Sequence, residues 1–188
     1  MQVRYTDLPM TKGFTLVELV VVIIILGILV VSAAGRFTGS SGYVEYTYQA
    51  RLISSLRNMQ LRAMHDTRAD YCFRVAFEDR GRPAFGPPTM SYNPDEIGHD
   101  PDDTCSDAID YTNPDYLSVS DNLEMRRAGV RLRLYGDDGT DFDYIGFNNL
   151  GQPLTTGNNC GTACRIELRA EQTIYVCVES EGYIHACE

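Results

Sequence analysis

The chain has 188 residues, of which 16 are Lys or Arg and 26 are Asp or Glu, so its formal net charge is −10 at pH 7. This length suits one globular domain with an added targeting or anchoring segment, and it argues against a second full domain. The acidic balance argues against a nucleic-acid-binding function, because it repels phosphates and anionic lipid headgroups at long range.

The amino-terminal region is the most apolar part of the chain. Residues 14–34 contain Glu18 as their only charge, and at about 1.5 Å per residue they reach across a hydrocarbon core of about 30 Å. Arg4 and Lys12 precede this block and favour a cytoplasmic amino terminus, although Asp7 and Arg36 reduce the charge difference. The sequence therefore predicts a single-pass membrane helix over residues 14–34.

A short polar leader ends directly before this block, in the run K-G-F-T-L-V-E over residues 12–18. An ordinary secretory signal has a shorter apolar core and is cut after it. The run resembles the signal of type IV prepilins. The resemblance implies removal of residues 1–13 by a prepilin peptidase, with cleavage between Gly13 and Phe14 and N-methylation of Phe14.

Glu18 is costly inside a bilayer, by about 2.5 to 3.5 kcal/mol, so a carboxylate there usually has a partner or a function. The resemblance implies an assembly role, in which Glu18 meets the amino group of Phe14 on a neighbouring subunit. The alternative is a glutamate that reaches water near the interface. A further alternative is signal-peptidase cleavage after Ala33, which would release a secreted domain; Glu18 within the apolar block argues against it.

Residues 35–68 are expected to continue the helix in amphipathic form. Gly35 and the cluster Gly39–Gly42 lower helix propensity, so the helix can open at either place. Beyond them, apolar and amide side chains recur at spacings of three and four and predict a stripe that packs on a sheet. The stripe comprises Gln49, Leu52, Ile53, Leu56, Gln60, Ala63 and Met64. The opposite, outer face is expected to carry Arg51, Ser55, Asn58 and Arg62.

The remaining residues, 69–188, are expected to form an exported domain rich in β-strands. Strict alternation predicts strands at 70–77 and 130–134. Further strands are expected at 144–147, 165–170, 173–178 and 183–187, separated by turn residues. Residues 78–122 lack periodicity and are predicted to form a long irregular loop. The fold class is therefore α+β, a long helix packed on an antiparallel sheet.

The C-terminal runs I-G-F-N-N-L-G-Q-P-L, R-I-E-L, T-I-Y-V-C-V and G-Y-I resemble those of pseudopilin H and FimT-type minor pilins. Residues 42–73 resemble a minor pilin of the mannose-sensitive haemagglutinin (MSHA) pilus. These resemblances imply a type IV pilin fold and a minor pilin that acts in pilus assembly, with other pilins as partners and a periplasmic domain that reaches the cell surface in the filament. The alternatives are a type II secretion pseudopilin and a secreted binding or adhesion domain.

All six cysteines follow the apolar block, where an exported domain meets an oxidising compartment. They are Cys72, Cys105, Cys160, Cys164, Cys177 and Cys187. Six thiols allow 15 connectivities. We expect complete pairing, with a local Cys160–Cys164 bridge and a Cys72–Cys105 bridge that tethers the long loop. A zinc site is disfavoured, because C-x3-C has no second cysteine pair and no nearby histidine.

No catalytic motif or phosphate-binding loop is present, so we expect neither an enzyme nor a cofactor. Residues 100–103 supply acidic ligands suited to calcium but lack EF-hand spacing, and a solvated loop with no metal is preferred. FimT-like proteins include DNA binders, and a basic cluster is present at Arg126, Arg127, Arg131 and Arg133. The net charge opposes phosphate binding, so we expect these arginines to pair with the acidic loop instead.

Overall fold

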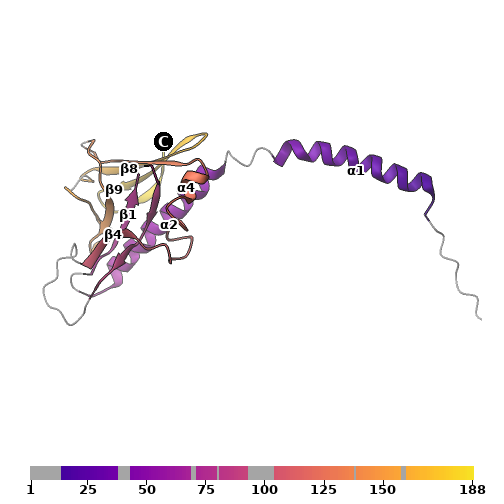
Figure 1. Cartoon of the computed structure of the whole chain (residues 1–188). Helices are drawn as coiled ribbons and strands as arrows, with labels where there is room; N and C mark the ends of the chain where they lie inside the picture. Colours follow the sequence, from indigo (N-terminus) through magenta and orange to yellow (C-terminus); the bar gives the residue numbers. More distant parts are fainter. Residues whose placement is uncertain are drawn as a thin grey trace, which may run out of the picture. The chain divides into compact units, whose positions relative to one another are not determined.

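The computed structural model describes residues 14–37, 43–68, 71–79, 81–92, 104–137, 139–157 and 160–188, leaving aside the side chains of 32–37 and 107. The chain divides into two compact units, residues 1–40 and 41–188 (Figure 1), which are described separately.

The first unit contains one helix, α1, which covers Leu16–Phe37. It continues through Gly35, so the helix does not open there. The other expected opening, at residues 39–42, lies outside the described residues. Within the part of the chain that the structure describes, no helix is both long enough and apolar enough to cross a membrane.

The second unit begins with α2, Val44–His65, and continues into antiparallel strands. One sheet has the order β2 (Ala84–Gly86), β1 (Arg74–Glu78), β6 (Tyr144–Phe147) and β7 (Pro153–Leu154). A second has the order β10 (Ile184–Cys187), β9 (Thr173–Glu179), β8 (Ala163–Arg169) and β5 (Arg131–Tyr135). Strands β3 (Pro88–Met90) and β4 (Cys105–Ile109) pair with each other, and α4 covers Glu124–Arg127. Helices and antiparallel sheets thus form an α+β fold.

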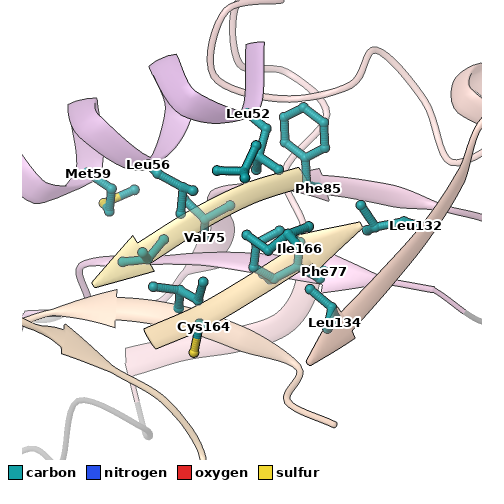
Figure 2. Close-up of a cluster of buried hydrophobic side chains, with 14 of the residues drawn as sticks. Leu52, Leu56, Met59, Val75, Phe77, Phe85, Leu132, Leu134, Cys164 and Ile166 are labelled. Atoms are coloured by element: carbon teal, nitrogen blue, oxygen red, sulfur yellow. The ribbon is translucent and has the colours of Figure 1, made fainter. Parts of the chain in front are cut away.

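The core lies where α2 packs against strands of both four-stranded sheets. Leu52 and Leu56 of α2, Val75 of β1 and Ile166 of β8 have no exposed surface. Figure 2 shows side chains from α2, β1, β5 and β8 converging in one cluster. Strand β5 alternates buried and exposed residues, which gives the second sheet one core face and one solvent face.

Several predicted strands appear within one or two residues of their expected bounds, and the strand at 144–147 has exactly the expected ends. The strand predicted over 70–77 is wrong at its start, because β1 begins only at Arg74. Its Val75, Ala76 and Phe77 are all buried, so they do not alternate. Strand β1 lies inside its sheet, between β2 and β6, and it also contacts α2 and β4. Both of its faces are therefore covered.

The loop predicted over residues 78–122 is not irregular throughout. It contains β2, β3 and β4, which are three to five residues long. Such strands are too short for a period-two pattern to stand out. Strand β2 pairs with β1, whereas β3 and β4 pair with each other within the segment.

The buried face of α2 includes polar residues that the predicted stripe did not contain, and one predicted member of the stripe is exposed. The buried residues are Glu45, Tyr48, Leu52, Ser55, Leu56, Met59 and Ala63, whereas Met64 is 48% exposed. Ser55 was expected on the outer face. Its hydroxyl donates a 2.6 Å hydrogen bond to the carbonyl oxygen of Leu117, which satisfies its polar atom inside the fold.

Candidate functional site

The amino-terminal motif forms the capped start of α1. The Thr15 hydroxyl oxygen accepts a 3.2 Å hydrogen bond from the Glu18 backbone N–H, and the Thr15 carbonyl accepts one from Leu19 N–H at 3.2 Å. Thr15 is therefore the N-cap, and Glu18 occupies the third helical position of a T-x-x-E capping sequence. A carboxylate in the first turn also interacts favourably with the helix dipole. The sequence analysis missed this local role for Thr15 and Glu18.

Phe14 lies directly before this cap, and Gly13 is outside the described residues. Glu18 is four positions after Phe14 in the chain, and α1 begins two residues after Phe14, at Leu16.

The part of α1 whose side chains are described is apolar on every side apart from Glu18. From Leu16 to Val31 only Glu18 carries a polar side chain, and every residue of this stretch is exposed. Phe14 is 81% exposed, and Ile28, halfway along the helix, is 62% exposed. A helix that is hydrophobic all round is ordinarily buried in a larger apolar environment. The single chain thus presents an apolar helix suited to packing against other helices or lipid.

All six cysteines are paired, in three disulfides. Cys160–Cys164 and Cys72–Cys105 are the two pairs that the sequence analysis favoured, and the third is Cys177–Cys187. Their Cα atoms are 4.8, 5.7 and 5.9 Å apart, respectively. The Cys72–Cys105 bond joins β4 to the segment before β1, and so connects the long segment over residues 78–122 to the first sheet. Three disulfides fit a domain that matures in an oxidising compartment.

A polar cluster fixes the segment before α4 to the long helix α2. Arg51 donates hydrogen bonds to the Glu124 carboxylate at 2.5 Å and to the Ser118 carbonyl at 2.6 Å. Tyr48 and the backbone N–H of Ser120 also donate to Glu124. Burial raises the pKa of Glu124, but the hydrogen bonds from Arg51 and Ser120 outweigh it and lower the pKa to about 2. Glu124 therefore stays ionised inside this cluster.

The glycines of the C-terminal motifs meet beside α2. The Gln60 side-chain amide donates hydrogen bonds to the carbonyl oxygens of Gly151 and Gly182 at 2.7 and 2.6 Å. Gly182 has φ +87, and a Cβ there would overlap the Gly151 carbonyl. These glycines thus let the β6–β7 and β9–β10 turns approach each other, which is a structural role.

The arginines of the predicted basic cluster come together only in part. Arg131 and Arg133 are exposed on one face of β5, and Arg126 lines the same surface hollow, whereas Arg127 pairs with Asp121 at 2.8 Å. The acidic segment 100–103 that was expected to pair with them lies outside the described residues. Among the residues that are described, no group of three or more acidic, His or Cys side chains is arranged to hold a metal ion.

One comparison with known proteins gives a match. The family model for the prokaryotic N-terminal methylation motif matches residues 9–34, which include the expected cleavage position, the Thr15 cap and Glu18. No curated protein and no solved structure matches the chain. The chain thus carries the prepilin-type amino-terminal signal of type IV pilin-like proteins.

Proposed function

We propose that this chain is a structural subunit of a type IV pilin-like filament. The observation that supports the proposal most directly is the N-terminal methylation motif over residues 9–34, which from Leu16 onward lies on a helix with exposed apolar side chains. A prepilin peptidase cuts after Gly13, and the new amino group of Phe14 is methylated. The helix α1 then packs against the corresponding helices of neighbouring subunits.

In this proposal Glu18 has two tasks. It occupies the third position of the helix cap, and its carboxylate pairs with the amino group of Phe14 on a neighbour. The second task offsets the cost of a carboxylate in an apolar environment and sets the axial offset between adjacent helices. Retention in the inner membrane before assembly, with the β-rich unit in the periplasm, is part of the same proposal and is supported by the motif.

The finer assignment is a minor pilin of the MSHA class that acts in pilus assembly, and it includes the type IV pilin fold for residues 14–188. It is supported by the C-terminal runs around Gly151 and Gly182 and by residues 42–73. The alternative is a type II secretion pseudopilin, because the amino-terminal motif serves both filaments. In either case the role is structural and not enzymatic.

The proposal that the chain is a filament subunit is tested by the processing of its amino terminus. Intact-mass analysis and N-terminal sequencing of the protein extracted from membranes are expected to give a mature chain that begins with N-methyl Phe14. A mature chain that begins at Ala34 would contradict the proposal and would support the secreted-domain alternative. Deletion of the gene, scored in parallel for surface pili and for secreted enzymes, then separates the pilus from the secretion system.

Two substitutions separate the tasks of Glu18. Glu18→Gln keeps an amide at the capping position but removes the charge, whereas Glu18→Ala removes both. If the charge pairs with Phe14 of a neighbour, both variants are processed normally and both lose filament incorporation. Val17→Ala, in the same helical turn, is the matched control and retains incorporation. Normal incorporation of Glu18→Gln would refute the pairing role and leave only the cap.

A further inference from the structure

Strand β5 lies at the end of its sheet. The strand order is β10-β9-β8-β5, and among the described residues β5 pairs only with β8. An edge strand presents unpaired backbone N–H and C=O groups on its outer side. Such an edge can accept another extended segment, whose backbone continues the hydrogen-bonded ladder.

Several arginines lie along this edge of an otherwise acidic protein. Arg131 and Arg133 of β5 are both exposed. In the register, Arg131 is directly opposite Arg169 of β8, whereas Arg133 is opposite Glu167. Like charges directly opposite each other destabilise a sheet. In this register neither Arg131 nor Arg169 has a carboxylate directly opposite it.

A surface hollow of about 600 Å³ runs beside β5. Arg126, Arg131 and Arg133 line it together with Asp79 and the backbone around Gly129. Three arginines thus border a hollow beside this strand. Guanidinium groups form paired hydrogen bonds with carboxylates.

We propose that the edge of β5 binds an extended, carboxylate-rich polypeptide segment of a partner protein by strand addition, with Arg126, Arg131 and Arg133 pairing with its carboxylates. This inference goes beyond the filament role and does not depend on the amino-terminal motif. Strand addition selects a polypeptide, because only a peptide backbone can continue the ladder. A nucleic acid or an acidic polysaccharide could contact the arginines, but it has no peptide backbone with which to continue the ladder.

The test measures peptide binding to the full-length protein in a nonionic detergent by fluorescence anisotropy. The probe is a short labelled peptide of alternating Glu and Thr. A second peptide has the same sequence with alternate backbone nitrogens methylated, which removes the donors needed for strand addition. The protein variants are Arg131→Ser/Arg133→Ser and, as a matched control, Arg62→Ser, which changes an exposed arginine of α2.

The acidic peptide is expected to bind the wild-type chain about tenfold more tightly than the double variant, the loss expected for two charge-assisted contacts. Arg62→Ser should change the affinity by less than about twofold. Backbone methylation should weaken binding about tenfold, and the amides of residues 131–135 should gain protection from hydrogen exchange when the peptide is bound. The double variant should keep the wild-type circular dichroism spectrum, because both side chains are exposed.

Three results would overturn the proposal. Equal binding of the methylated peptide would show that the contact does not use the strand edge. Equally tight, arginine-dependent binding of single-stranded DNA or polygalacturonate would show a general polyanion site. Absence of peptide binding would show that the arginines only protect the edge from unwanted pairing.

Discussion

The ion pair between Arg51 and Glu124 offers a quantitative test of the packing around α2. The substitution Arg51→Met keeps an unbranched apolar stem but removes the guanidinium group, which leaves Glu124 without its charged partner. The two side chains are only 16% and 22% exposed, so water replaces the lost partner poorly. A change in the pKa of Glu124 from 4.5 to about 2 corresponds to about 3 kcal/mol at 1.36 kcal/mol per unit. Part of this comes from Ser120, so we expect the substitution to cost about 2 kcal/mol of unfolding free energy at pH 7.

The assay is urea unfolding of the full-length protein in nonionic detergent, with the disulfides intact, at several pH values. The pKa of Glu124 is lower in the folded state than in the unfolded state. Its stabilising contribution is therefore present above about pH 4.5 and is lost as the pH falls towards 2. In Arg51→Met this acid-dependent loss should be smaller, because the pKa of Glu124 moves back towards its usual value.

Arg62→Met is the control, since Arg62 is exposed on the same helix and its replacement should change the unfolding free energy by less than about 0.5 kcal/mol. The reasoning would be refuted if Arg51→Met were as stable as the control at pH 7. It would also be refuted if both variants lost stability equally between pH 4.5 and pH 2, because the ion pair would then not hold the pKa of Glu124 down.

Three further predictions follow from other contacts. Gly182→Ala should lower the free energy of unfolding in urea by at least about 2 kcal/mol, because it combines a positive φ with overlap at the Gly151 carbonyl. Gly129→Ala, where φ is +75 but the surrounding space is open, should cost less. An equal cost of the two substitutions would contradict the overlap. Thiol labelling under denaturing, non-reducing conditions should find no free cysteine in the exported protein, and six reactive thiols would contradict the three disulfides. The pKa of His185 should lie above its usual value of 6.5, because the Glu179 carboxylate raises it. The stabilising effect of protonated His185 is therefore present below pH 6.5 and is lost as the pH rises through the folded-state pKa. In Glu179→Gln, an NMR titration should find the His185 pKa closer to 6.5, and an unchanged pKa would rule out this cause.

The sequence predicted best where the information is local. The leader, the expected cleavage position and Glu18 form one continuous run, and the family match over residues 9–34 covers the end of the leader, that position and Glu18. Strands such as β5 and β8 could be predicted because one face is covered and the other is solvated, which produces alternation in the sequence. Strand β1 has both faces covered, so its start was placed too early and its alternation was overestimated.

The contacts of the candidate sites were harder to predict, because their partners are far apart in the chain. Ser55 was assigned to the outer face of α2, and only the position of the Leu117 carbonyl explains its burial. Arg51 was likewise taken as solvent-facing, whereas it meets Glu124, 73 residues away. A polar residue on a helix gives no local sign of which distant group will satisfy it.

The amino acid sequence by itself determined the prepilin-type start of the chain, the α+β class and the apolar character of α1, because each depends on neighbouring residues and their periodicity. Only the tertiary structure decided that Arg131 lies opposite Arg169 and that β5 ends its sheet. Strand order and register are set by pairing between distant segments, and a shift of one residue would turn every side chain to the other face. The positively charged edge of β5 therefore exists only in the folded chain.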